Sequence, residues 1–498
     1  MRRSCLRERP HHGWVWTGIR LMPLPPADFQ ARVHIPNSGW PIDRTILDPY
    51  YERAQQVFQL GPFAYEGSAW ATPEHPILPL DPTQLRTRMY QFGDGQVFLK
   101  YYRTALADVP NLTICYHATA VELESNADGT AISTVQVKSS PQKTFRVRAS
   151  QIVVANGGFA ATQLLLNSDA QHQGGIGNHS GNLGRYLMDH PYLYGGELIP
   201  SSRHIFNETT LYDMRMVENV PVMAHLQLAD ELLVREPMLG LSVLMFPRER
   251  NYEAHRSLNP RQQRGFDAFI KLRRDIVMGH TPHTELFRDV VTGADGLVKR
   301  SLDRLLFPKA LIGRGGWSRL PMKHLRYHSF EIVHQAEQAP HRDNCVRLSH
   351  ERDELGMRRI IIDWRWHAED VAAVMRAQDC FATEFQRSGI GTFKLARQDG
   401  QPVVLSHSMA HYMGATRMHA DPQQGVVDAN CKVHGIANLY VASCSVFPTG
   451  GFANPTLTIV ALAIRIADQV KRQLAGPPTL NLPAVTLGLD SSNLAIPA

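Results

Sequence analysis

The 498-residue sequence lacks a long hydrophobic run and has few cysteines. No apolar stretch reaches the roughly 18 residues that a membrane-spanning helix needs, so we expect no such span. The six cysteines form no CxxC pair, which argues against a zinc site or a disulfide framework. Unpaired cysteines favour a reducing compartment, and hence a cytoplasmic location. The basic start of the chain has no apolar core of the kind found in secretory signals.

Charge of one sign is not concentrated anywhere in the chain. Lys and Arg number 52 and Asp and Glu number 46, which gives a net charge of +6 without any Lys/Arg block. This distribution gives little support to nucleic-acid binding, and we expect none. A composition of 43% hydrophobic and 20% charged residues is that of an ordinary globular protein with a large core.

A glycine turn of the form GxGxxG between a buried strand and a helix is also missing. Such a turn holds the pyrophosphate of a dinucleotide in the doubly wound fold. The nearest matches begin at Gly93, Gly175 and Gly313, but each lacks the third glycine and none follows a buried strand. A dinucleotide site built from these residues would therefore need other contacts.

Hydrophobic periodicity predicts a mixture of helices and strands. The helices are expected over 43–60, about 95–106, 160–167, 369–388 and 455–470. The strands are expected over 112–117, 120–124, 130–139, 151–155, 331–337, 346–349, 359–364 and 438–442. We expect residues 1–40 to be irregular, the polar stretch 247–281 to be a surface insertion, and the Pro-rich tail to be extended or disordered.

Two residues near the C-terminus could carry chemistry. His411 lies in a Gly-rich turn, and Asn454 precedes Pro455 and a long apolar helix 43 residues later. A neutral imidazole can accept the proton of an alcohol at neutral pH, and an amide can orient the substrate oxygen without titrating. The alternative is structural, with His411 a satisfied core histidine and Asn454 the N-cap of a helix that starts at Pro455.

A metal site is a weaker alternative for the same region. His407 and His411 are four residues apart and His419 lies close, so two imidazoles could share one helical face. No Glu follows His407, and Gly414 would interrupt a helix early. We therefore expect no metal.

The segment 410–470, AHYMGATRMHADPQQGVVDANCKVHGIANLYVASCSVFPTGGFANPTLTIVALAIRIADQV, closely resembles the C-terminal signature of glucose-methanol-choline (GMC) oxidoreductases. Segments 152–168 (IVVANGGFAATQLLLNS), 181–191 (GNLGRYLMDHP) and 337–364 resemble further family elements, so the resemblance covers roughly residues 14–472. Asn454 in place of a second histidine is similar to the branch of pyranose-oxidase-like and fructose-dehydrogenase-like members.

The resemblance implies a combined α/β and α+β fold. An FAD-binding, doubly wound (Rossmann-like) domain would be formed by 1–191 and 391–474, a substrate domain with an antiparallel sheet by 192–390, and a flexible tail by 475–498. By the same resemblance His411 is the catalytic base and Asn454 its orienting partner. The residues implied at the FAD site are Trp16, Gly18, Ala120, Ala155, Gly157, Gly158, Ala442, Ser443, Pro455 and Thr456.

The implied activity is oxidation of a CH–OH group of a small alcohol, sugar or polyol by hydride transfer to FAD. Only 15 residues precede the segment that matches the family after its first βαβ unit, so we expect that unit, with its GxGxxG turn, to be missing. The rival hypothesis is a non-catalytic remnant that binds no FAD. The electron acceptor and the exact substrate stay open.

Overall fold

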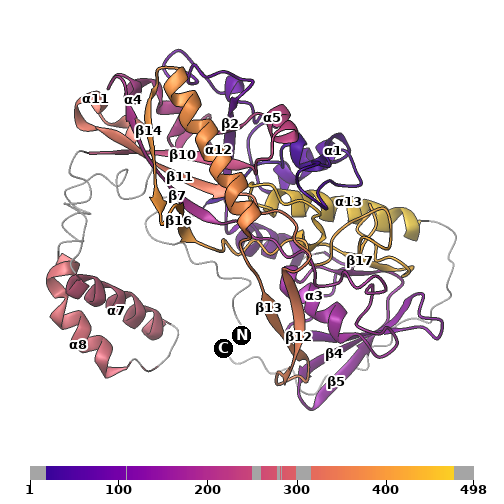
Figure 1. Ribbon diagram of the computed structural model, residues 1–498. Coiled ribbons are helices and arrows are strands. Elements are labelled where there is room, and N and C mark those ends of the chain that lie inside the picture. Colours follow the sequence, from indigo (N-terminus) through magenta and orange to yellow (C-terminus); the bar gives the residue numbers. More distant parts are fainter. Residues whose placement is uncertain are drawn as a thin grey trace.

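The computed structural model describes residues 18–107, 109–249, 260–277, 281, 283–298 and 316–475. Its largest element is a ten-stranded antiparallel sheet (Figure 1). The central path runs β1 (Gly18–Leu21), β2 (Leu85–Asp94), β9 (Val220–Leu228), β10 (Leu241–Arg248), β11 (Ser329–Ala336), β7 (Tyr192–Pro200), β16 (Gln401–Ser406) and β15 (Arg397–Gln398). Two further strands, β14 (Gly391–Leu395) and β8 (Arg215–Val217), pair with β7 and β9.

The long helix α12 (Ala368–Arg387) crosses this sheet (Figure 1). Its apolar side chains recur at helical spacing and are buried in one cluster with residues of β7 and β11. They include Val374, Phe381 and Phe385, which pack with Leu193 and Ile332. The helix therefore covers one face of the sheet, and the other face is left to the site described below.

A second set of elements surrounds one short parallel pair, β6 (Ile152–Val154) and β17 (Leu439–Val441). Beside it lie the helices α3 (Gly158–Asn167), α13 (Thr456–Leu474) and α1 (Arg44–Val57). The strands β3 (Thr119–Ser125), β4 (Ile132–Ser140) and β5 (Lys143–Val147) form a small antiparallel sheet, and β12 (Cys345–Arg352) and β13 (Arg358–Asp363) form a hairpin. The hydrophobic cluster of this second set also includes residues of β2, β9, β10 and β11, and a second cluster lies between the large sheet and α12.

The shorter elements connect these layers. They are the 3₁₀ turns η1 (Pro26–Phe29), η2 (Gly67–Ala69), η4 (Thr210–Tyr212), η5 (Trp317–Arg319) and η6 (Cys444–Val446), the π-helical turn η3 (Phe98–Tyr102), and the helices α2 (Arg103–Ala107), α4 (Ile205–Glu208), α5 (Asp230–Arg235), α7 (Pro260–Val277), α8 (Thr284–Thr292) and α11 (Lys323–Arg326).

Helices α7 and α8 pack on each other, apart from the rest of the molecule (Figure 1). Gly265 and Gly293 make this close approach possible, because a Cβ on Gly265 would lie 2.5 Å from the Gly293 Cα. This placement agrees with a surface insertion for 260–277, but the expectation is wrong for Pro247 and Arg248, which are buried at the end of β10. The tail after residue 475 lies outside the described residues.

Most of the expected helices and strands are present, but the strand expected over 112–117 is wrong. Leu112, Ile114 and Tyr116 alternate as in a strand, yet they are exposed, at 42%, 48% and 75%. No described strand pairs with this segment, and extended backbone without a partner forms no ladder. The expectation that residues 1–40 are irregular is also wrong in part, because β1 lies within this stretch.

The described part of the expected doubly wound domain consists of the parallel pair β6–β17 and the helices beside it, in an α/β arrangement. Within the part of the chain that is described, the far edge of β6 has no neighbouring strand, and Val153 on it is 43% exposed. Parallel strands are usually covered on both sides, so this edge is an unusual feature of the surface.

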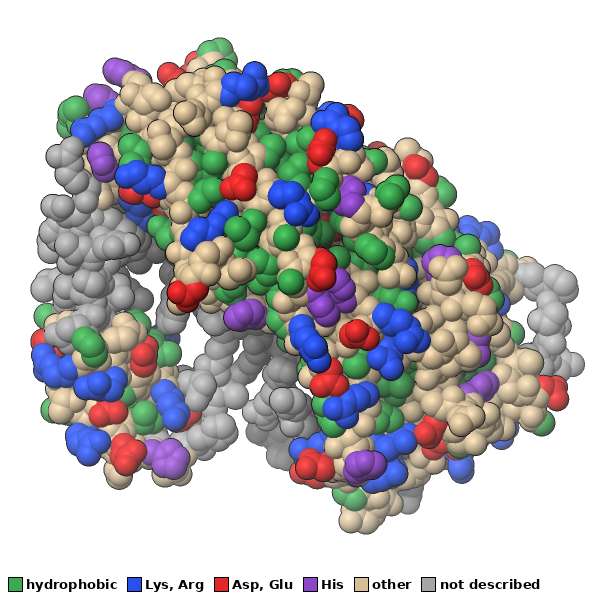
Figure 2. Space-filling model, viewed as in Figure 1, with side chains coloured by type: hydrophobic (Ala, Val, Ile, Leu, Met, Phe, Trp, Pro, Cys, Tyr) green, Lys and Arg blue, Asp and Glu red, His purple; other side chains and the backbone are tan. Residues whose placement is uncertain are grey.

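On the face shown in Figure 2, basic and acidic side chains are mixed. None of the described helices is long and apolar enough to cross a lipid bilayer.

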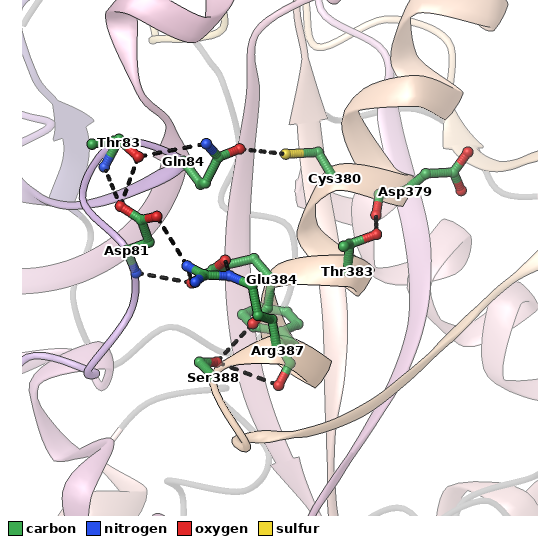
Figure 3. Close-up of polar contacts among 10 residues, drawn as sticks. Asp81, Thr83, Gln84, Asp379, Cys380, Thr383, Glu384, Arg387 and Ser388 are labelled. Atoms are coloured by element: carbon green, nitrogen blue, oxygen red, sulfur yellow. Dashed lines mark hydrogen bonds and ion pairs between the residues drawn. The ribbon is translucent and has the colours of Figure 1, made fainter.

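The C-terminal end of α12 is fastened to the loop that precedes β2 (Figure 3). Glu384, only 2% exposed, accepts hydrogen bonds from the Asp81 backbone N–H and from Arg387 Nε, both at 2.8 Å. Arg387 also reaches the Asp81 carboxylate at 3.0 Å. The buried carboxylate thus joins the helix to the loop that leads into β2.

Replacing Glu384 with Ala should lower the free energy of unfolding by about 1–3 kcal/mol, because a buried N–H loses its acceptor and Arg387 its nearest partner. The ion pair itself contributes little, since the Arg387 side chain is 57% exposed. Denaturant titration measures the change. Asp379→Ala is the matched control on the same helix, because that side chain is 63% exposed; a loss no larger than the control's would contradict this role of Glu384.

Burial lowers the pKa of His334 on β11 to about 4, although its Nδ1 lies 3.2 Å from the Ser242 carbonyl. The unfolded chain therefore binds the proton first as the pH falls below about 6.5. Stability tied to this group is present above pH 6.5 and is lost between pH 6.5 and 4, by up to about 3 kcal/mol.

His334→Gln removes the titrating group, so its unfolding free energy should fall less steeply between pH 6.5 and 4.5 than that of the wild type. Urea denaturation at several pH values gives both slopes. Equal slopes would mean that His334 does not carry this linkage.

Candidate active site

His411 lies in an irregular loop that follows β16. The buried carboxylate of Asp189 holds this loop, because its Oδ1 accepts from the backbone N–H groups of Met409 and His411, both at 3.1 Å. Its Oδ2 accepts from the Ser408 hydroxyl. Burial is the main cause that raises the pKa of Asp189, and these hydrogen bonds work against the rise.

The backbone is strained one residue before His411. Ala410 has φ of 63°, a left-handed conformation that costs a non-glycine residue on the order of 1 kcal/mol. The contacts of Asp189 on both sides of Ala410 keep the loop in this conformation, which sets the direction of the His411 side chain.

The imidazole of His411 lies beside a second imidazole, that of His190. The two Nδ1 atoms are 2.9 Å apart. Burial lowers the pKa of His190 to about 3. The pKa of His411 also lies well below its usual range, because of burial first and then the charges of His190 and Arg20. Both rings are therefore neutral at pH 7, and His411 is able to accept a proton.

Asn454 lies one residue before the N-cap of α13, which is Pro455. Its Oδ1 accepts from Gln335 Nε2 at 2.9 Å and lies 3.5 Å from an Arg20 guanidinium nitrogen. The side chain therefore does not cap the helix, in contrast to the structural alternative. Gln335 Nε2 also lies 3.0 Å from His190 Nδ1, so a chain of contacts connects Asn454 to His411.

The loop before Asn454 is clamped from several directions. Thr449 Oγ1 accepts from the Gly39 N–H at 2.8 Å, and its carbonyl accepts from Trp40 Nε1 at 3.2 Å. A Cβ on Gly451 would lie 2.1 Å from Asp28 Oδ2, so only glycine fits there.

A fully buried ion pair lies behind this loop. The Arg32 guanidinium binds both carboxylate oxygens of Glu337, one of them at 3.0 Å, and Glu337 Oε2 also accepts from the Gly240 N–H at 2.8 Å. Burial, with the charge of Glu337 as the second cause, raises the pKa of the neighbouring Asp28 well above its usual range.

Four site residues were not singled out in the sequence: Arg20, Asp189, His190 and Gln335. Asp189 and His190 stand in the DHP triplet of a segment that resembles the family, but the triplet alone carries no indication of contact with His411. Gln335 is a polar residue inside a predicted strand, which was a usable signal. Arg20 lies in the stretch that was expected to be irregular, and the sequence gives no signal for its role.

The starts of α3 and α13 fit the flavin and phosphate groups of FAD. Neither helix has a side-chain cap, so their first N–H groups are open to an electron-rich ligand. Ala155 and Gly157 before α3 are exposed, and a Cβ on Gly157 would meet no atom within 4 Å. Gly158 instead packs on the backbone beside His411, because its Cβ would lie 2.4 Å from the Tyr412 carbonyl oxygen.

The other residues expected at FAD are dispersed. Ala442 and Ser443 are buried after β17, and the Ser443 hydroxyl accepts from the Ser445 N–H. The remaining expected residues are Gly18 in β1, Ala120 in β3, and Pro455 and Thr456 at the start of α13. Trp16 lies outside the described residues. Contact of each with FAD stays a prediction.

The histidines considered for a metal do not converge. His407 lies near Trp364, with ring centroids 6.2 Å apart, and His419 Nδ1 accepts from the Asp421 N–H at 2.9 Å. Among the residues that the structure describes, no three His, Cys, Asp or Glu side chains are grouped to hold a metal ion.

Comparison with known proteins gives a match to the family model described as GMC oxidoreductase over residues 340–463. Paromamine 6'-oxidase of Streptomyces fradiae is 25% identical over 76% of this chain and 56% of its own length. The 2-methyl-1,2-propanediol dehydrogenase of Mycolicibacterium austroafricanum is 27% identical over 39% of this chain and 35% of its own length.

The chain thus spans little more than half the length of the first of these relatives. A solved structure, the FAD-dependent oxidoreductase from Chaetomium thermophilum, covers 88% of this chain and 81% of its own at 14% identity, with a TM-score of 0.44. That likeness is too distant to inform the site.

The family match contains both His411 and Asn454, whereas Gln335 and His190, which connect them, lie outside it. Residues 340–463 are thus similar to GMC oxidoreductases, and FAD is the cofactor that this similarity supports.

Proposed function

We propose that this protein oxidises a CH–OH group of a small molecule with FAD. The observation that carries the proposal is the neutral imidazole of His411, which is linked through His190 and Gln335 to the amide of Asn454 at the open start of α13. When bound, FAD supplies the acceptor for the hydride. Oxidising the alcohol also requires a base for the hydroxyl proton.

His411 is the proposed base. Its ring is uncharged at neutral pH, because burial and the nearby Arg20 charge disfavour the protonated form. Asp189 holds the backbone on which this ring sits. The hydroxyl proton moves to the imidazole while the substrate carbon is oxidised.

Asn454 is the proposed partner that orients the substrate oxygen. Its Oδ1 is occupied by two donors, Gln335 and Arg20, so its NH₂ group is the one turned away from them. That NH₂ group makes no hydrogen bond to any residue that the structure describes. A hydrogen bond from it to the substrate oxygen would stabilise the alkoxide character of the transition state.

The substrate we propose is a sugar or a polyol, bound within 192–390 against the antiparallel sheet that carries Gln335, with FAD held by 1–191 and 391–474. The two relatives are named for paromamine and for 2-methyl-1,2-propanediol, which is a diol. Anaerobic bleaching of the FAD absorbance by a panel of sugars, polyols and simple alcohols tests this class. Protein that takes up FAD but is bleached by none of them would contradict it, and protein that takes up no FAD would favour the non-catalytic remnant.

In the FAD-loaded protein, His411→Ala should slow flavin reduction by about 10²–10⁴, the usual contribution of a general base. FAD content should stay near that of the wild type, since the proposed role is proton transfer. Stopped-flow absorbance near 450 nm measures the rate. His407→Ala is the control, because His407 is an exposed neighbour in the same loop. Equal rates for the wild type and His411→Ala would remove His411 from the mechanism.

Asn454→Asp should damage catalysis more than Asn454→His. An ionised Asp offers no N–H to the substrate oxygen and places a negative charge where alkoxide character develops, whereas His keeps a donor. The start of α13 and Arg20 would both stabilise the Asp side chain, so folding should be intact. Single-turnover reduction rates decide the order. An Asp variant as fast as the His variant would overturn the placement of Asn454 at the reacting oxygen.

A further inference from the structure

We propose that Arg20 sets the tautomer of His411 through a relay of directed hydrogen bonds that passes through Gln335 and His190. In this relay His411 carries its proton on Nδ1, and Nε2 is the atom that accepts the substrate proton. The kinetic consequence rests on the proposed function, but the tautomer itself can be observed without activity.

The relay starts at Arg20 because a guanidinium can only donate. One of its terminal nitrogens lies against Gln335 Oε1 and 3.5 Å from Asn454 Oδ1. Whichever amide atom faces Arg20 must therefore be an oxygen, which settles the orientation of both amides. Among the described residues no carboxylate lies within 4 Å of Arg20, so no stronger acceptor competes for these N–H groups.

The orientation of the Gln335 amide in turn determines which nitrogen of His190 is unprotonated. With its oxygen turned to Arg20, its NH₂ group faces the Phe452 carbonyl at 2.6 Å and His190 Nδ1 at 3.0 Å. The side chain is fully buried on β11, so it cannot turn around without losing these partners. Asn454 Oδ1, at 2.9 Å, is a third neighbour of the Gln335 amide nitrogen, so the two N–H groups are shared among three atoms. Because an NH₂ group only donates, a protonated Nδ1 would place a donor against a donor, and we therefore assign His190 Nδ1 as the unprotonated nitrogen of that ring.

His190 then determines the proton of His411. The ring of His190 is fully buried and neutral, so its proton is on Nε2, which has no hydrogen-bond partner among the described residues and therefore no acceptor that opposes this assignment or competes with it. The two Nδ1 atoms are 2.9 Å apart, and one of them must donate. Since His190 Nδ1 carries no proton, His411 Nδ1 is the donor, and the lone pair of His411 lies on Nε2.

The orientation of the Asn454 amide is fixed by donors in the same way. Its Oδ1 faces donors from both Arg20 and Gln335, so its NH₂ group is left for the substrate oxygen. One cation thus determines an acceptor atom on His411 and a donor group on Asn454, which is the pair that removes a proton from a hydroxyl and holds its oxygen. Arg20 acts through these residues and is a positioning residue.

The direct test is ¹⁵N-histidine labelling of the full chain with two-bond ¹⁵N–¹H correlation spectra at pH 7. The signals of His411 are identified by their loss in His411→Gln. We expect the wild-type ring to show the Nδ1–H pattern. An Nε2–H pattern in the wild type would overturn the proposal outright.

Variants of Gln335 and Arg20 should change the tautomer of His411 in different ways. Gln335→Glu keeps the shape but places an acceptor opposite His190 Nδ1, so His190 should protonate there and His411 should change to the Nε2–H form. Arg20→Met frees the Gln335 amide, and a mixture of the two tautomers is expected. Arg20→Lys keeps a donor-only side chain and should preserve the wild-type pattern.

An unchanged Nδ1–H pattern in both Gln335→Glu and Arg20→Met would overturn the proposal. If Gln335→Glu does not fold, the contrast between Arg20→Lys and Arg20→Met decides. In FAD-loaded protein, Gln335→Glu should slow flavin reduction on the order of 10²-fold or more, since the base is then blocked. Wild-type protein with the Nδ1–H pattern but no flavin reduction would contradict the proposed function and leave the relay standing.

Discussion

The buried ion pair between Arg32 and Glu337 is the contact on which the site depends. Both side chains are fully buried, and an unpaired charge at this depth would cost several kcal/mol. The pair joins the segment after η1 to the end of β11, and Glu337 also holds the Gly240 backbone. With Asp28 against Gly451, the same cluster limits where the loop that leads to Asn454 can run.

His411 and Asn454 are held in place by different kinds of contact. His411 is held through its backbone, by the Asp189 carboxylate, which also binds the backbone N–H on the other side of the strained Ala410. Asn454 is held through its side chain, by donors from two strands of the antiparallel sheet. Arg20 acts on both, since its charge adds to the burial that lowers the pKa of both imidazoles, and its N–H groups orient the amides.

Local patterns in the sequence were sufficient for the elements whose partners lie nearby. Helix α1, the β3–β4 hairpin, and helices α3, α12 and α13 all follow from periodicity and turn residues. The pattern at 112–117 was equally strand-like, but a strand needs a neighbour, which a single segment cannot supply. For the same reason Arg20, Gln335 and His190 escaped notice, because each acquires a role only where β1, β11 and the segment after residue 188 meet.

The open edge of β6 has a consequence for how this protein behaves in solution. Backbone N–H and C=O groups along that edge have no partner among the described residues, and apolar side chains from 98–116 are exposed on the same chain. A strand in this state is a template for pairing with another polypeptide. A strand of the same chain that paired with this edge would cover it. A strand of another molecule that paired there would instead lead to self-association.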